Sequence, residues 1–248
     1  MASANFAIWH KADRNFALAF VIAAWAVVLI GFYPAVSGRW RGEADYAAPA
    51  ILQVHVFSFV GWLCLLTGQV MLIRAGRREW HRKFGLGAAL LIPLLVVTGL
   101  GAETYSQRFY SPQSPGNLRF FIFPLTTMVS FALVAVAAIW FRANTTAHKR
   151  LIMLGTSLIL VAAFNRWWGE GIYEMMGDEY WGTLVRNCIG PDLMIAVLLL
   201  YDLVTRCRVH PALAIAVPPI LAAQFAEAAI YHSDWWPGVA RTLAGVPG

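Results

Sequence analysis

The sequence predicts an all-α membrane protein that crosses the bilayer seven times and forms a single transmembrane domain over residues 1–248. Seven long segments are almost free of charged residues, and short loops rich in Lys or Arg join them on every second side. The composition agrees, with 59% hydrophobic residues, 13% charged residues and a mean hydropathy of +0.61. Because an ordinary soluble domain has about 25% charged residues, we expect lipid to surround most of this chain.

Each predicted helix rests on a segment that is long enough to cross a bilayer. A spanning helix needs roughly 20 mostly apolar residues, because lipid offers no hydrogen-bond partner to an exposed backbone. We therefore expect spans over 15–35, 49–73, 84–105, 119–141, 150–168, 183–204 and 211–230. The first apolar run exceeds the roughly 7–15 residues of a signal-peptide core, so it is expected to remain as a helix.

Charges interrupt two of the predicted spans, and prolines mark irregular helices. The sixth is interrupted by Arg186, Asp192 and Asp202, and the seventh carries only Glu227. Proline frees a backbone carbonyl and kinks a helix, and kinked membrane helices can line cavities. Such residues lie in the third, sixth and seventh spans, at Pro93, Pro191, Pro218 and Pro219.

The distribution of basic residues predicts an N-terminus inside and a C-terminus outside. With this orientation, the inner side holds twelve of the 19 Lys and Arg residues and three of the 13 acidic residues. Short cytoplasmic loops carry such an excess of positive charge. Insertion and contact with anionic lipid headgroups at the inner face then account for the net charge of +6, and a nucleic-acid partner is excluded.

Short motifs give the chain a resemblance to a known group. They are His55 with Trp62 and Gln69, the run Trp80 to Gly85, the run His148 to Leu154, and Arg166. This set resembles a group of uncharacterised bacterial multipass membrane proteins with His-Arg-x-Leu-Gly and His-x-Arg-x-x-Met helix starts. The chain departs from the first pattern at Phe84, where the group has Leu. The resemblance implies a bacterial inner-membrane protein and implies no reaction.

Ionisable and amide side chains gather in the predicted outer half of the bundle. Such residues are costly inside a membrane, so each is a candidate for function. We expect Arg166 to pair with Asp192, with His55 in reach, and we expect a polar pocket open to the outer side. Its predicted ligand-binding residues are His55, Asn165, Arg166, Asp192 and Gln224. The alternative is a closed cluster that only fixes helix packing.

The remaining carboxylates and cysteines do not predict a metal site, and the sequence leaves any cofactor unidentified. Glu103, Glu170 and Glu227 are expected to be interfacial and solvated. No local spacing such as His-x-x-x-His joins two potential ligands, and the three cysteines are scattered. A haem between two histidines is disfavoured, because only His55 lies well inside a span.

A second set of residues is predicted at the inner face, where basic clusters open three outgoing helices. This ring comprises His81, Arg82, His148, Arg150 and His210. Its histidines could respond to pH, hold a metal or bind anions at helix starts. Because neighbouring Arg and Lys disfavour a bound cation, we expect a basic belt that contacts lipid headgroups.

The sequence leaves three functional hypotheses open. The first is an inner-membrane protein with an outward-facing polar pocket for a small ligand, a cofactor headgroup or a proton. The second is an accessory subunit of a larger membrane complex, with no chemistry of its own. The third is a redox protein that uses haem or quinone. No catalytic residue is assigned, so the sequence does not favour an enzyme.

Overall fold

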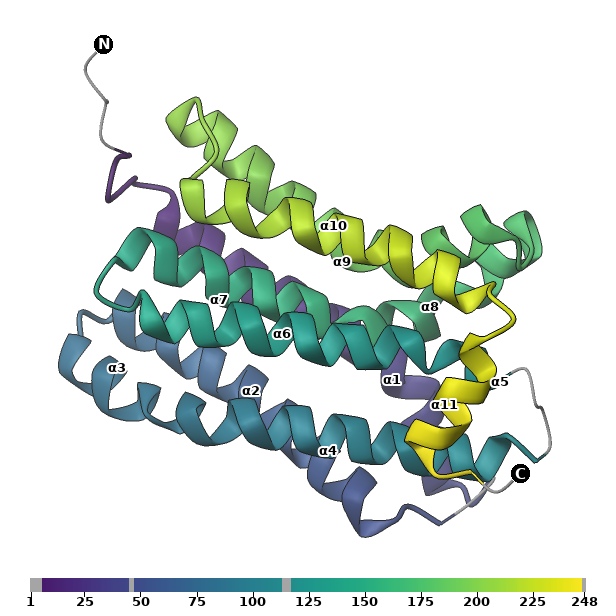
Figure 1. Ribbon diagram of the computed structural model, residues 1–248. Coiled ribbons are helices and arrows are strands. Elements are labelled where there is room, and N and C mark those ends of the chain that lie inside the picture. Colours follow the sequence, from purple (N-terminus) through teal and green to yellow (C-terminus); the bar gives the residue numbers. More distant parts are fainter. Residues whose placement is uncertain (1–5, 45–46, 113–116, 247–248) are drawn as a thin grey trace.

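The computed structural model describes residues 6–44, 47–112 and 117–246, and the regular structure in these residues is entirely helical (Figure 1). The predicted all-α fold class is therefore confirmed. The helices are α1 (Asp13–Trp40), α2 (Ala50–Arg74), α3 (Arg78–Gly85), α4 (Gly87–Tyr110), α5 (Asn117–Phe120), α6 (Ile122–Trp140), α7 (Thr145–Ile159), α8 (Val161–Met176), α9 (Tyr180–Arg206), α10 (Pro211–Tyr231) and α11 (Trp236–Ala244).

The long apolar helices correspond in order to the predicted spans. In the described residues, six segments are long and apolar enough to cross a membrane: α1, α2, α3 with α4, α5 with α6, α9, and α10. The pair α7 and α8 adds a seventh if it is counted as one span, but its two halves are bent by 44°. The fold is thus compatible with a multi-pass membrane protein of six or seven spans.

The bend between α7 and α8 arises from hydroxyl side chains and close packing. Thr156 and Ser157 donate to the carbonyls of Ile152 and Met153, each over 2.9 Å. Side chains that bond back four residues in this way tend to bend helices. Leu160 is fully buried at the break. Its N–H donates to the carbonyl of Ser157, three residues earlier, over 3.3 Å, so the helical turn is tighter here than in a regular α-helix.

The helix α7 forms the centre of the bundle, because eleven of its 15 residues are buried. It packs against α6, α9 and α10. Phe131, Leu154, Leu198 and Leu213, one from each of these helices, are at most 2% exposed. The hydrophobic core therefore runs along α7, and polar residues on its buried face need partners from the surrounding helices.

Several long helices expose large apolar side chains on the outer surface of the bundle. Leu29, Leu90, Leu133 and Val204 are each more than 60% exposed. In water, apolar patches of this extent mark an interaction site. Lipid contact explains them here, since these helices also have the length that a bilayer requires.

The bundle has two distinct ends (Figure 1). We call the end where α1 begins, and where the α2–α3, α6–α7 and α9–α10 connections lie, the basic end. The α8–α9 turn, α5 and α11 lie at the opposite end. The helix α11, which was not predicted, is held there by bonds from Trp236 Nε1 to the Arg119 carbonyl (3.1 Å) and from Arg108 Nε to the Ala244 carbonyl (2.6 Å).

Candidate functional site

A small polar cavity lies between α6, α7, α8, α9 and α10, in the half of the bundle nearer the opposite end. Its volume is about 30 Å³. A site needs about 10–15 Å³ of such space to hold one water molecule, so one or two waters fit. The lining residues are Phe123, Thr127, Ser130, Leu158, Val161, Asn187, Cys188, Pro191, Ile220, Gln224 and Glu227.

Three hydrogen bonds donated by side-chain amides orient the polar wall of this cavity. The buried Gln224 donates from Nε2 to Asp192 Oδ1 over 2.9 Å, which joins α10 to α9. Asn165 of α8 donates to Asn187 Oδ1 over 2.7 Å, and Asn187 donates to the Thr183 carbonyl over 2.9 Å. Three helices therefore place amide and carboxyl groups around one point.

Glu227 adds a second carboxyl group to the cavity. It lies three residues after Gln224 on α10, so both side chains project from the same face. Glu227 is only 6% exposed. The expectation that Glu227 is interfacial and solvated is therefore wrong, because its side chain lines a cavity together with Phe123 of α6 and Asn187 of α9.

The carboxyl groups of Asp192 and Glu227 have no cationic partner nearby. Neither forms an ion pair with any residue that the structure describes. Gln224 donates to Asp192 and lines the same cavity as Glu227, so the two carboxyl groups lie on either side of one amide. Two carboxyl groups in one apolar bundle disfavour each other's ionisation. Among the described residues no ion pair offsets this cost, and Asp192 has the hydrogen bond from the Gln224 amide.

Three of the five predicted pocket residues come together. Asp192 and Gln224 are bonded to each other beside the cavity, and Asn165 reaches its wall through Asn187. His55 lies elsewhere, between α2 and α4, with its Nδ1 3.2 Å from Thr98 Oγ1.

The predicted pairing of Arg166 with Asp192 is wrong. The Arg166 guanidinium lies 4.7 Å from the centre of the Phe32 ring on α1, and it donates to the Ala162 carbonyl over 3.1 Å. Asp192 instead accepts from Gln224. Successive residues of a helix point about 100° apart, so when Asn165 faces α9, Arg166 faces α1.

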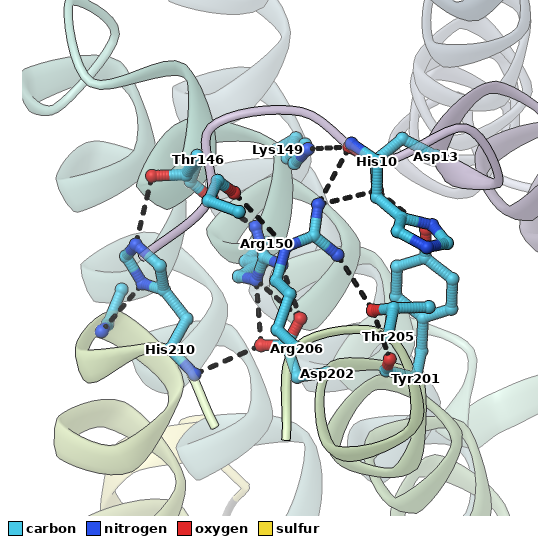
Figure 2. A network of polar contacts seen from close by, with 12 residues as sticks. His10, Asp13, Thr146, Lys149, Arg150, Tyr201, Asp202, Thr205, Arg206 and His210 are labelled. Atoms are coloured by element: carbon cyan, nitrogen blue, oxygen red, sulfur yellow. Dashed lines mark hydrogen bonds and ion pairs between the residues drawn. The ribbon is translucent and has the colours of Figure 1, made fainter. Parts of the chain in front are cut away.

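A second polar cluster, which the sequence analysis missed, lies buried at the basic end (Figure 2). Asp202 of α9 accepts from Arg150 Nε at 3.0 and 2.8 Å, and Arg150 Nη2 also donates to its carboxylate. The Arg150 side chain is 3% exposed and the Asp202 side chain is 1% exposed. Removing one partner of such a pair strands a buried charge and typically costs about 3–5 kcal/mol, so this pair locks α7 to α9.

His210 extends this cluster to α10 (Figure 2). Its Nδ1 accepts from the Ala212 N–H over 3.0 Å and caps α10, so its Nε2 carries the proton and donates to Thr146 Oγ1, also over 3.0 Å. Burial and the nearby Arg150 charge lower the pKa of His210 to about 4. The imidazole is therefore neutral at pH 7 and serves as a structural link.

The first residue of α1 and the chain before it close over the same cluster. Asp13 accepts hydrogen bonds from Lys149 (2.7 Å), Tyr201 (2.5 Å) and Arg206 (2.8 Å) (Figure 2). The Phe6 ring lies 5.2 Å from the Arg206 guanidinium. The positive charges at this end are thus partly neutralised within the protein.

The predicted inner ring is divided among different environments. Arg150 and His210 belong to the buried cluster, whereas Arg82 is exposed. His148 lies on α7 with its Nδ1 2.8 Å from the Ala138 carbonyl, and His81 is partly buried on α3. The ring is therefore not one continuous belt, because His210 and Arg150 turn inward to meet Asp202.

The described parts of the chain contain no large cluster of metal-binding side chains. Across these residues, no group of three or more His, Cys, Asp or Glu side chains is placed to hold a metal ion. The polar cavity is thus the candidate functional site, and the cluster at the basic end is a structural lock. The chain matches no protein-family model, no curated protein and no solved structure, so its function has to be inferred from the geometry of these sites.

Proposed function

We propose that this protein is a bacterial inner-membrane protein that holds water and an exchangeable proton in the polar cavity, which faces the outer half of the membrane. The observation that carries the proposal is the pair of carboxyl groups, Asp192 and Glu227, placed around Gln224 without a cation. Gln224 donates to Asp192, and Glu227 lines the cavity one turn further along α10.

The energetics favour a retained proton. An ionised Asp at the centre of a membrane helix costs about 2.5–3.5 kcal/mol on insertion scales. Two adjacent negative charges would add repulsion. A single proton shared by Asp192 and Glu227 lowers both costs. One or two waters in the cavity can connect this proton to the polar residues of the cavity wall.

The surroundings of the cavity support exchange rather than permanent sealing. Asp192 is partly exposed, and Pro191 lies both in the wall and inside α9. Proline frees the carbonyl four residues earlier, which is that of Asn187, another wall residue. The freed Asn187 carbonyl is thus a hydrogen-bond acceptor between Asp192 and the cavity, along which a proton could pass.

Infrared difference spectroscopy of the purified protein in lipid nanodiscs tests the proposal. We expect a carbonyl band of a protonated carboxyl group at neutral pH that shifts in D₂O. Glu227→Gln or Asp192→Asn should remove or displace it. Glu174→Gln is the matched control, since this glutamate is exposed near the end of α8, and it should leave the band unchanged. Absence of the band, or a band that survives both cavity variants, would refute the proposal.

A further inference from the structure

Three residues of the sequence motifs, Gln69, His81 and His148, meet near the basic end outside both sites described above. Trp62 Nε1 donates to Thr156 Oγ1 over 3.1 Å, which sets the register of α2 against the antiparallel α7. Gln69 lies seven residues beyond Trp62, and His148 lies eight residues before Thr156. At about 1.5 Å per residue, both positions are displaced by roughly 11–12 Å towards the basic end.

His81 reaches the same place from α3. A Cβ atom added at Gly85 would lie 3.8 Å from Gln69 Nε2, so this part of α3 faces the Gln69 side chain. His81 precedes Gly85 by one turn and therefore lies on the same face. His81 is also near enough to His148 for the two imidazoles to interact electrostatically.

Two of the three side chains, those of Gln69 and His81, carry buried polar atoms that the described part of the protein does not satisfy. Among the described residues, Gln69 Nε2, Gln69 Oε1 and His81 Nδ1 are buried without a hydrogen-bond partner. Buried polar atoms of native proteins are nearly always paired with protein, water or an ion. Three such atoms in one place indicate a bound species.

His148 is oriented as metal-binding histidines are. Its Nδ1 lies 2.8 Å from the Ala138 carbonyl, and a carbonyl oxygen can only accept. Nδ1 therefore carries the proton, and the lone pair of Nε2 remains available. Metal-binding histidines almost always donate their second ring N–H to such an acceptor, which fixes the tautomer.

Ion pairs weaken the electrostatic objection to a cation at this end. Lys83 pairs with Glu79 at 2.7 Å, and Lys149 pairs with Asp13 at 2.7 Å. Arg150, next along α7, is neutralised by Asp202. Lys149 and Arg150, the basic residues that follow His148 in the sequence, are thus both paired with carboxylates, although Lys149 shares Asp13 with Arg206.

We propose that Gln69, His81 and His148 bind a divalent transition-metal ion. His81 Nδ1 and His148 Nε2 supply two imidazole nitrogens, which suit zinc, copper, nickel and iron. Gln69 Oε1 is the third protein ligand, and a fourth position stays open to water, which can accept from Gln69 Nε2.

Titration with Co²⁺, followed by visible absorption and competition with Zn²⁺, tests this site. The protein carries no polyhistidine tag and has Cys64→Ala and Cys207→Ser, so that neither a tag nor an exposed thiol contributes. We expect one Co²⁺ per chain. His81→Gln and His148→Gln should each weaken binding by at least about tenfold, the lower range for losing even an outer partner.

Matched controls separate metal binding from folding and from bound water. His232→Gln removes an exposed histidine at the opposite end and should bind Co²⁺ as the parent protein does. Each variant is checked for a single peak in size-exclusion chromatography. Gln69→Leu removes the third proposed ligand and should also weaken Co²⁺ binding. Absence of stoichiometric Co²⁺ binding, or unchanged affinity in both folded histidine variants, would mean that water alone occupies the site and would overturn the proposal.

Discussion

At the scale of single residues, the charge pairs demonstrate what a sequence can reveal about a membrane interior. Arg166 with Asp192, and Arg150 with Asp202, are equally plausible pairs when only depth along the helices is considered. The structure joins the second pair and not the first. Depth follows from residue number, but the direction in which a side chain points depends on helix rotation, which packing determines. The candidate residues were therefore partly predictable and their partners were not.

The neutral His210 predicts a specific loss of stability in acid. Its pKa is lowered to about 4 in the folded protein, against about 6.5 in an unfolded chain. The unfolded state binds the extra proton between these values, so the stability contributed by this group is lost as the pH falls from about 6.5 to 4. His210→Asn keeps a cap on α10 without titrating, and its thermal unfolding temperature in detergent should depend less on pH in this window.

The control for this experiment is His232→Gln, which removes an exposed histidine outside the cluster. We expect this variant to keep the pH dependence of the parent protein. If His210→Asn shows the same slope between pH 6.5 and 5 as the parent, His210 does not carry the linkage.

At the scale of helices, the long apolar elements were predictable and their irregularities were not. Runs of about 20 apolar residues have few alternatives to a spanning helix, and α1, α2, α9 and α10 match the predicted spans within a few residues at most ends. The 44° bend at Leu160 has neither proline nor glycine at the break. It depends on Thr156, Ser157 and tertiary packing, which a search for breakers does not detect.

Close packing of α1 against α8 leads to a prediction about two helical glycines. A Cβ atom at Gly31 would overlap the backbone carbonyl of Ala163, whereas one at Gly68 of α2 would meet nothing within 4 Å. Gly31→Ala should destabilise the protein by about 1–3 kcal/mol, the usual cost of overpacking. Gly68→Ala should be neutral or stabilising by up to about 1 kcal/mol, because alanine favours a helix.

Unfolding of the two variants in mixed detergent, followed by circular dichroism, compares these free energies directly. The same chemical change is made at both positions, so helix propensity is matched and only the contact differs. Equal stability of Gly31→Ala and Gly68→Ala would contradict the close approach of α1 and α8.

At the scale of the whole molecule, orientation in the membrane connects the two proposed sites. The polar cavity lies in the half nearer α11, and Gln69, His81 and His148 lie near the basic end. With the basic end inside, as the positive charges favour, the carboxyl pair faces outwards and the metal site faces the cytoplasm. Cysteine labelling tests this arrangement.

The native Cys207 is exposed at the basic end, and Asp234 is exposed at the opposite end. In a Cys64→Ala background, a membrane-impermeant maleimide added to intact spheroplasts should label Asp234→Cys and should not reach Cys207. After lysis both positions should react, which controls for accessibility, and Cys188 should stay unlabelled because it is buried. Labelling of Cys207 in intact spheroplasts, with Asp234→Cys protected, would mean that the topology is reversed. The carboxyl pair would then exchange its proton with the cytoplasm, and the histidine pair would take its metal from outside.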